Sequence, residues 1–589
     1  MGLFTAACLF RDDPRAPAWR ESAICWLLDS GMTPLDRVSS RVLSDGKPIG
    51  SKVGHITIQP DFTAENHGIV HPDYLGAPLA YRAQFILFSK LAGDTGEIPG
   101  IFINWDNIYN KVFKVCASAD GGVVPIQSQD WWYYRIGMLN IHIATKLLFD
   151  DRHAALLEKK CLHVLETTQA GHDNGTFIDN EPDKCIVSND FQTLTDMEPS
   201  FCSALAVAWL WYMVGGEGVT PVNCEEYEAD ICRVKHYPHG GTVLQRTKDA
   251  FNAFSYRNSA IAFSLPKDKL WTITVPPCST FGAMKFKDDC SEDYGLSNQD
   301  TIRYVENLRV YDDIDTFAAA ASINRGLGKA RQDVAFVSLP DGVAVYFSRV
   351  KAVKDCSIES YTSGLTGVRN EYYKLMPEFA KGYRNIYVDD REPVKMEGYI
   401  GGEDIITDFG KARFVAIDDK ISYILHGGNN VRYISHHHYP KWKGIEDFLV
   451  LNYMENVEMK AGDELPLYVQ VCLPNENIEK AREKRLYVSC GGNTDGVILG
   501  DRFIFSSLLP SEGLSETSFR IEAGEVPLFE GSVSFRDGIY THSQTLPVRG
   551  CGVRTALAKV KTDRNFDAVV LPCGNTLIRF EGENTYHSL

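Results

Sequence analysis

The first 225 residues carry apolar side chains at the spacing of amphipathic helices. Positions three and four residues apart repeat as one helix face in six stretches: residues 16–30, 77–91, 101–115, 131–149, 153–167 and 201–214. Gly and Pro fill the intervals, as in residues 93–99 and 215–221. Asp150 and Asp151 leave only a tight turn between two of these helices. We therefore expect helical hairpins with short connections.

From about residue 226 the pattern changes to short alternating segments rich in Val, Ile, Tyr and Phe. Residues 334–338 and 343–350 flank a Pro-Asp-Gly turn, and residues 568–572 and 576–580 flank Cys-Gly-Asn, so each pair predicts a hairpin. Further expected strands cover residues 253–265, 270–275, 486–489, 497–499 and 503–506. A doubly wound α/β fold is excluded, because its strands and helices alternate along the chain.

These patterns predict an α+β multidomain protein. We expect a helical domain over residues 1–225, an antiparallel β-sandwich domain over 226–480 and a C-terminal β-sheet domain over 481–589. We expect the helical hairpins to stack; their arrangement as an (α/α) toroid, complete or incomplete, is implied by the family resemblance described below.

Charge and composition limit which partners the protein can bind and indicate its cellular compartment. The chain has 589 residues and a net charge of −17, without a long basic block, so no nucleic-acid partner is expected. The longest apolar run, near residues 201–214, is too short for a membrane span. The first ten residues lack a basic region, and the 15 Cys include no CxxC pair. We expect a cytoplasmic protein in a reducing compartment, or a secreted or periplasmic one if an N-terminal leader lies outside this sequence. The oligomeric state is open.

The densest polar cluster lies between two expected helices and contains Asn66, His67, His71 and Tyr74. Asn66 and His67 are adjacent, so a bent loop can aim both at one point, and Gly68 permits an unusual backbone dihedral. We predict that Asn66 and His67 are catalytic and that His71 and Tyr74 contact substrate. The alternative is a capping loop with solvated imidazoles.

A second cluster leads into the helix expected over residues 131–149. A Tyr beside a cation has a lowered pKa, which suits proton transfer. We predict that Tyr133 or Tyr134, together with Arg135, is catalytic and that Gln129 and Trp131 contact substrate. The alternative is that these aromatic side chains belong to the core.

Other candidates stand alone. Glu198 precedes a proline and is expected to begin a helix, where a carboxylate suits the dipole. His436 and His438 share one face of an expected strand. They can contact substrate or begin a zinc site, but no carboxylate or thiol follows closely, so no metal is predicted. Arg246 and Arg257 are possible anion contacts.

At this point the sequence resembles the toroid-plus-β-sandwich polysaccharide lyases, the alginate lyase and heparinase II/III-like group. The resemblance rests on helical hairpins before antiparallel sheets, on Asn66-His67-Gly68, and on Tyr133 or Tyr134 about 65 residues further on. It implies an anionic, uronate-containing polysaccharide as substrate and no cofactor. We count about half the helices of a complete toroid. The segment from His71 to Tyr74 departs from the pattern, which leaves the particular uronate polymer open.

The resemblance also implies a reaction. Removing the C5 proton of a uronic acid moves negative charge onto its carboxylate, where Asn66 and His67 act as donors. Tyr133 or Tyr134 is base and acid if the proton and leaving group share one side, and otherwise a His is the base and a Tyr the acid. Arg135 holds the carboxylate or lowers the Tyr pKa.

Two other functions remain open. A glycoside hydrolase needs two carboxylates about 5–9.5 Å apart; the candidates are Glu65, Asp73, Asp130 and Glu198. A non-catalytic carbohydrate-binding protein binds through its aromatic side chains without turnover.

Overall fold

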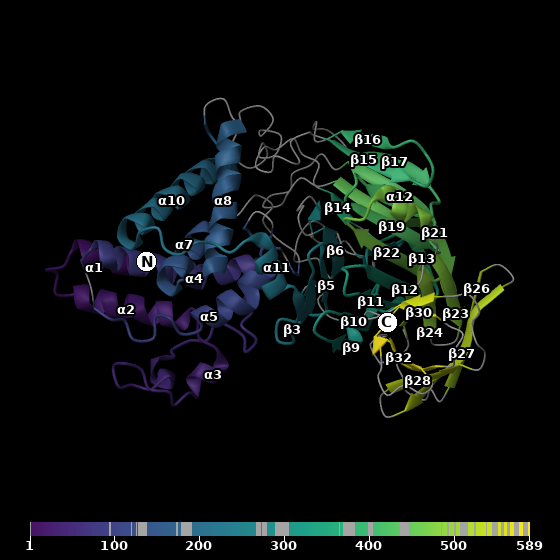
Figure 1. Ribbon diagram of the computed structural model, residues 1–589, viewed down its shortest axis with the longest axis horizontal. Coiled ribbons are helices and arrows are strands. Elements are labelled where there is room, and N and C mark those ends of the chain that lie inside the picture. Colours follow the sequence, from purple (N-terminus) through teal and green to yellow (C-terminus); the bar gives the residue numbers. More distant parts are fainter. Residues whose placement is uncertain are drawn as a thin grey trace.

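The computed structural model describes the chain in segments (Figure 1). They are residues 2–66, 68–93, 96–118, 121–124, 126–127, 138–171, 175–177, 191–258, 260–266, 272–273, 280–288, 305–364, 366–368, 383–397, 404–435 and 447–484, followed by the C-terminal strands given below. Most helices lie in the N-terminal part of the chain and mainly antiparallel sheets follow, so the α+β organisation is confirmed. The division into three domains remains a prediction.

The helices follow the expected order. They are α1 (Gly2–Leu9), α2 (Ala16–Asp29), α3 (Pro34–Arg37), η1 (Ile49–Lys52), α4 (Pro72–Leu91), α5 (Trp105–Ile108), the π turn η2 (Tyr109–Phe113), α6 (Lys114–Cys116), α7 (Met138–Phe149), α8 (Arg152–Gly171), α10 (Phe191–Gly215) and α11 (Cys224–Ile231). The helix expected over residues 101–115 begins only at Trp105 and is interrupted by the π turn. The last helix before the sheets, α11, ends at Ile231, so the change to strands comes at Cys232 rather than near residue 226.

One expectation about α10 is wrong. Glu198 does not begin a helix, because α10 starts at Phe191 and continues through Pro199. A proline removes one backbone donor from a helix.

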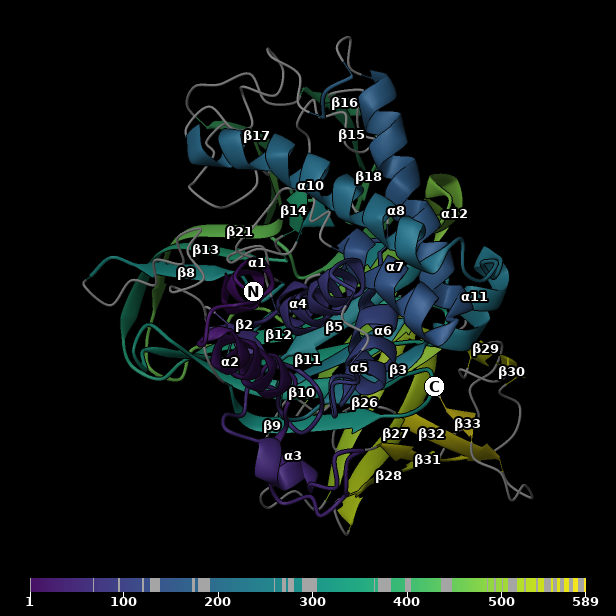
Figure 2. The ribbon, with the colours of Figure 1, turned by 90° about the vertical axis from the view of Figure 1, so that its left-hand side faces the viewer.

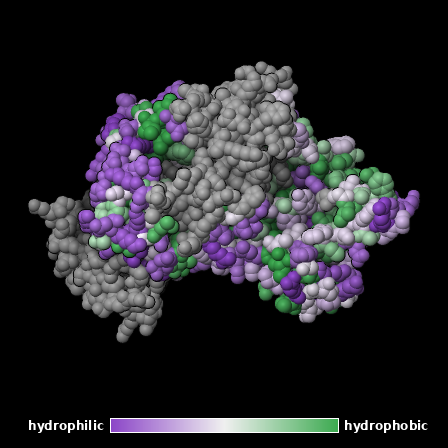
Figure 3. Space-filling model, turned by 180° about the vertical axis from the view of Figure 1, so that it is seen from behind, coloured by the Kyte–Doolittle hydropathy of each residue, from purple (hydrophilic) through white to green (hydrophobic). Residues whose placement is uncertain are grey.

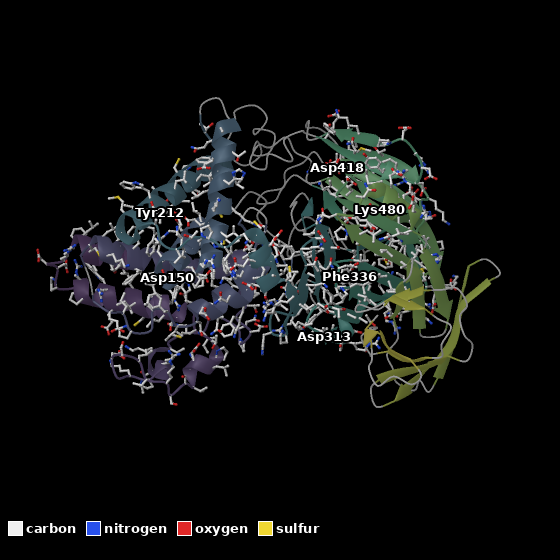
Figure 4. The ribbon with its side chains drawn as sticks, in the orientation of Figure 1. Asp150, Tyr212, Asp313, Phe336, Asp418 and Lys480 are labelled. Carbon is white, nitrogen blue, oxygen red and sulfur yellow. The ribbon has the colours of Figure 1, made fainter. Side chains whose placement is uncertain are left out.

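Short-range interactions explain the turns between helices. Asp150 adopts a left-handed conformation with φ 52°, and Asp151 Oδ1 accepts the Ala154 N–H at 2.8 Å, which caps α8 (Figure 4). The expected helical hairpin of α7 and α8 is thereby confirmed. Lys146 of α7 then binds Glu158 of α8 at 2.9 Å inside the hairpin.

A four-stranded sheet follows the helices. Its strands are β3 (Arg233–Tyr237), β4 (Thr242–Arg246), β5 (Ala250–Ser255) and β6 (Ala262–Pro266), in that spatial order. The single strand expected over residues 253–265 is wrong, because β5 and β6 form an antiparallel pair. Asn258 has φ 64° between them, and such a residue lets the chain reverse direction. In Figures 1 and 2 this sheet lies beside the helices and the larger sheets.

Two large sheets form the sandwich. The nine-stranded sheet has the order β16 (Val394–Glu397), β15 (Tyr383–Val388), β18 (Phe414–Ile417), β19 (Ile421–His426), β22 (Tyr468–Pro474), β12 (Ala344–Ala352), β11 (Ala330–Ser338), β10 (Phe317–Arg325) and β9 (Glu306–Asp312). The seven-stranded sheet has the order β17 (Ile405–Gly410), β20 (Asn430–Ser435), β21 (Asp447–Met459), β13 (Cys356–Ser363) and β8 (Ala283–Phe286). In addition, β14 (Thr366–Val368) pairs with β21, and β7 (Thr272–Ile273) pairs with β14.

The nine-stranded sheet is buried on both faces. Tyr346 and Tyr423 belong to the main core together with Leu449 of the other large sheet. On the opposite face Val345 packs with Ile478 of α12 (Ile478–Glu483). The hairpin of β11 and β12 is confirmed, with Ser338 paired to Ala344. Burial on two faces explains why these strands read as nearly continuous apolar runs.

The C-terminal strands form two smaller sheets. One contains β23 (Leu486–Gly491), β24 (Thr494–Leu499), β25 (Arg502–Ser506), β29 (Gly552–Arg554) and β30 (Lys559–Lys561). The other contains β26 (Glu516–Ala523), β27 (Val526–Arg536), β28 (Ile539–Gln544), β31 (Phe566–Val570), β32 (Thr576–Phe580) and β33 (His587–Ser588). The expected hairpin of β31 and β32 is confirmed, with Val570 opposite Thr576.

The surface of the helical half includes apolar side chains (Figure 3). Leu9, Trp26, Trp209 and Met213 are more than half exposed. None of the described helices is both long and apolar enough to cross a membrane.

Candidate functional site

The predicted cluster around Asn66 is a small β-hairpin. β1 (Glu65–Asn66) pairs with β2 (Ile69–Val70), and Asn66 lies opposite Ile69. Gly68 has φ 79°, the special dihedral expected from the sequence, and donates its N–H to Glu65 Oε1 at 2.6 Å. Asn66 is exposed. The hairpin therefore presents an amide in a defined place.

A buried glutamine anchors this hairpin. Val70 is fully buried and donates its N–H to Gln127 Oε1 at 2.8 Å. The amide nitrogen of Gln127 donates to the carbonyl of Gly240, in the turn between β3 and β4. One side chain thus joins the hairpin of the helical half to the first sheet. Gln127 stands at the start of the second polar cluster, but nothing in that pattern separates a buried bridge from a ligand contact.

His71 and Tyr74 follow the hairpin directly. Their rings meet edge to face with centroids 5.9 Å apart. His71 is only 7% exposed, so it offers little surface to a ligand, and its substrate contact stays a prediction. Tyr74 is half-buried in the first turn of α4 and retains accessible surface.

The other predicted site residues fall outside the described part of the chain. These are His67, Gln129, Trp131, Tyr133, Tyr134, Arg135, His436 and His438. For Glu198 only the backbone, inside α10, is described. Their roles stay predictions.

The turn between β3 and β4 is held against the helical half at several points. Asp61 accepts the N–H of His239 at 2.7 Å and that of Gly240 at 2.9 Å. Tyr237 donates its hydroxyl to the Lys111 carbonyl at 2.6 Å. With the Gln127 bridge, these contacts fix the sheet end next to the hairpin.

A chain of three polar side chains lies at the same sheet end. Asp312 Oδ1 is 3.0 Å from His236 Nδ1, and His236 Nε2 is 3.0 Å from the Tyr256 hydroxyl. Asp312 ends β9, His236 is in β3, and Tyr256 follows β5. No short motif links residues so far apart in sequence, so sequence reasoning missed them. Pairing of the strands brings them together.

Neighbouring charges both raise and lower the pKa of Tyr256. Burial raises the pKa of Tyr256 to about 12, the neighbouring Arg257 lowers this pKa, and Asp61 and Asp312 raise it further. The phenol is therefore protonated at neutral pH. Arg257 is exposed and remains a possible anion contact.

Arg246 does not have the role expected from the sequence. Its side chain is 1% exposed, and its guanidinium binds both carboxylate oxygens of Glu228 at 3.1 and 2.9 Å. It also donates to the carbonyls of Val115 and Ala117. Arg246 thus joins β4 to α11 and α6, and is not free to bind an anion.

Comparisons with known proteins found similar solved structures but no similar sequence. No protein-family model and no curated protein matches the sequence. A heparinase III structure is similar at a TM-score of 0.42 and 10% identity, over 86% of this chain and 64% of that one. A mutant of the heparan sulfate lyase HepC from Pedobacter heparinus is similar at a TM-score of 0.39 and 9% identity, over 86% of this chain and 64% of that one. A further heparinase III structure is similar at a TM-score of 0.40 and 10% identity, over 86% of this chain and 66% of that one.

These structures belong to the group that the sequence resembles. The chain spans about two thirds of their length, 64% to 66%. At such TM-scores and identities, the likeness assigns neither an activity nor a substrate to this chain.

Proposed function

We propose that this protein is a polysaccharide lyase that cleaves a uronic-acid-containing polysaccharide by β-elimination and leaves an unsaturated uronate end. The observation that carries the proposal is the exposed amide of Asn66 on a hairpin anchored by buried Gln127. A fixed donor stabilises charge that develops on a substrate carboxylate, because it needs no reorganisation during the reaction.

In the proposed chemistry the C5–H electron pair forms the C4–C5 double bond, and the C4–O4 electron pair leaves with O4. Asn66 and His67 donate to the uronate carboxylate as the C5 proton leaves. Tyr133 or Tyr134 acts on the C5 proton and the departing O4, with Arg135 beside it. The elimination is proposed without a cofactor, because no electron leaves the substrate and no group is transferred from outside.

The proposal extends to the shape of the protein and to its ligand. We propose that the helices form all or part of an (α/α) toroid. The substrate is an anionic polysaccharide or oligosaccharide, and its further contacts are proposed at Tyr74, Gln129, Trp131, Glu198, His436 and His438. Arg257, exposed beside the hairpin-bound turn, adds a positive charge for such a ligand.

The test is a panel of uronic-acid polymers, including alginate, glucuronan and glycosaminoglycans, incubated with the full chain. A lyase creates a conjugated C4–C5 double bond that absorbs near about 235 nm, whereas a hydrolase produces reducing ends without this absorbance. We expect absorbance with at least one polymer. Reducing ends alone would favour the glycoside hydrolase, and binding without turnover would favour the carbohydrate-binding protein.

A further inference from the structure

Asp312, His236 and Tyr256 form a hydrogen-bonded chain, here called the relay, beside the candidate hairpin. We propose that the relay is a proton-donating unit of the active site, in which Tyr256 protonates the departing O4 of the substrate. This inference rests on the proposed elimination. It adds an acid from the first sheet to the groups proposed on the helical half.

The relay is tied to the hairpin through one short turn. Gln127 connects Val70 to the carbonyl of Gly240, and the Tyr256 N–H donates to the carbonyl of the next residue, Gly241, at 2.9 Å. The backbone of Tyr256 and the hairpin of Asn66 are therefore held by adjacent peptide groups. Asp61, which binds the same turn, is close enough to influence the Tyr256 charge.

The hydrogen-bond chemistry gives the relay a direction. A carboxylate oxygen accepts, so Asp312 Oδ1 accepts the N–H of His236 Nδ1 and orients the ring. The other ring nitrogen, Nε2, lies 3.0 Å from the Tyr256 hydroxyl, so a proton on Nε2 can pass to this oxygen after the hydroxyl proton has moved to O4. A carboxylate that orients an imidazole against a hydroxyl is the arrangement of proton-transfer triads, here with a phenol as the last group.

The solvent exposure of the three side chains favours a role in proton transfer over a role in folding stability. The side chain of His236 is 24% exposed and that of Asp312 is 40% exposed, so water reaches both. Exposed polar contacts of this kind add little to folding stability. Tyr256 is half-buried, which keeps its proton in place until a base appears nearby. Because water reaches His236 and Asp312, a proton from solvent can pass through His236 to Tyr256 after each turnover.

The elimination balances with the relay as acid. The base proposed on the helical half, Tyr133 or Tyr134, takes the C5 proton, and the C5–H electrons form the C4–C5 double bond. The C4–O4 bond breaks with its electrons on O4, which takes the proton of Tyr256. His236, protonated by water, returns a proton to the phenolate, and the base releases its proton to solvent. No oxidant or reductant takes part.

The experiment uses the full chain and a polymer that the unmodified protein cleaves. We expect Tyr256→Phe to lower kcat by about 100-fold and to change KM by less than about threefold, because the group acts on the departing oxygen. His236→Gln and Asp312→Asn should each lower kcat about tenfold and change the pH profile of kcat. The control is Tyr453→Phe, a phenol that binds the carboxylate of Glu455 on the distant β21; it should leave kcat unchanged.

A second substrate separates an acid from a merely structural tyrosine. A uronate that carries a low-pKa phenol on C4 needs no proton on its departing oxygen, so Tyr256→Phe should cleave it at nearly the unmodified rate. If Tyr256→Phe and His236→Gln both retain more than half of kcat on the polymer, the relay is overturned while the lyase proposal stands. If they cleave the activated substrate as poorly as the polymer, the acid role is overturned as well. If the unmodified protein produces no unsaturated product from any polymer, the lyase proposal fails and the relay fails with it.

Discussion

At the scale of single residues, the site contains two side-chain amides with different roles, one exposed and one buried. Asn66 is exposed and available to a ligand, whereas Gln127 is completely buried and connects two backbone segments. Both are amides near polar clusters in the sequence. Burial alone separates their functions, and burial was not predictable from these clusters.

Removal of the exposed amide should affect turnover rather than folding. We expect Asn66→Ala to lower elimination by about 10²-fold, as loss of one oxyanion-type donor commonly does. Initial rates of unsaturated product formation measure the effect. Asn324→Ala, an exposed amide on β10, is the matched control. Equal rates for the two variants would show that Asn66 does not act in the reaction.

Removal of the buried amide should affect folding first. Gln127→Leu leaves the Val70 N–H and the Gly240 carbonyl without their partner, which costs about 1–3 kcal/mol for each buried group left unsatisfied. Urea denaturation gives the free energy of unfolding. The control is Gln84→Leu on α4, a glutamine that is only half-buried. A variant as stable as the control would contradict the anchoring role.

At the scale of elements, a histidine of helix α7, His142, connects the helix to the turn at Gly121. His142 is completely buried; its Nδ1 lies 2.7 Å from the Tyr109 hydroxyl and its Nε2 lies 2.8 Å from the Gly121 carbonyl. Burial lowers the pKa of His142 from 6.5 to about 4. The folded protein therefore keeps this imidazole neutral at pH values where the unfolded chain binds a proton.

This shift makes stability depend on pH in a defined window. Between about pH 6.5 and pH 4 the unfolded state binds more protons at this site, so the free energy of unfolding falls as pH falls through that range. Above pH 6.5 the contribution is constant. Denaturation of the unmodified protein, His142→Gln and the exposed control His163→Gln at several pH values measures it. We expect a smaller pH slope only in His142→Gln; equal slopes in all three would reject the assignment.

Elements also show where sequence patterns were reliable. The hairpins around residues 338–344 and 570–576 were predictable, because turn residues stand between two alternating runs. The reversal between β5 and β6 was not, since Asn258 at φ 64° replaces the expected glycine signal. Helix α10 was placed too short, because Pro199 reads locally as a helix start, whereas the helix runs from Phe191 through Pro199 to Gly215.

At the scale of the whole molecule, the helical half and the first sheet are joined by a buried ion pair. Arg246 of β4 binds Glu228 of α11 and the carbonyl ends of α6. In the sequence Arg246 reads equally well as a contact for an anion. Its carboxylate partner lies 18 residues away on another element, so only the tertiary structure shows that it is already occupied.

Breaking this pair should weaken the junction. Glu228→Ala leaves a buried guanidinium without its counter-charge, which costs about 3–5 kcal/mol. Guanidinium chloride denaturation measures the loss and shows whether one transition separates into two. Glu225→Ala on the exposed side of the same helix is the control. A loss no larger than that of the control would mean that the pair does not hold the halves together.

The sequence by itself determined the order of helices and strands, several hairpins and the polar segment that holds Asn66, because periodicity and turn residues act over a few neighbouring positions. Only the tertiary structure decided that His71 is covered, that Arg246 is paired, and that Asp312, His236 and Tyr256 meet at one sheet end. The reason is physical. Burial and side-chain contacts between distant segments arise from the packing of strands and helices against one another, and a local pattern carries no record of which segments will meet.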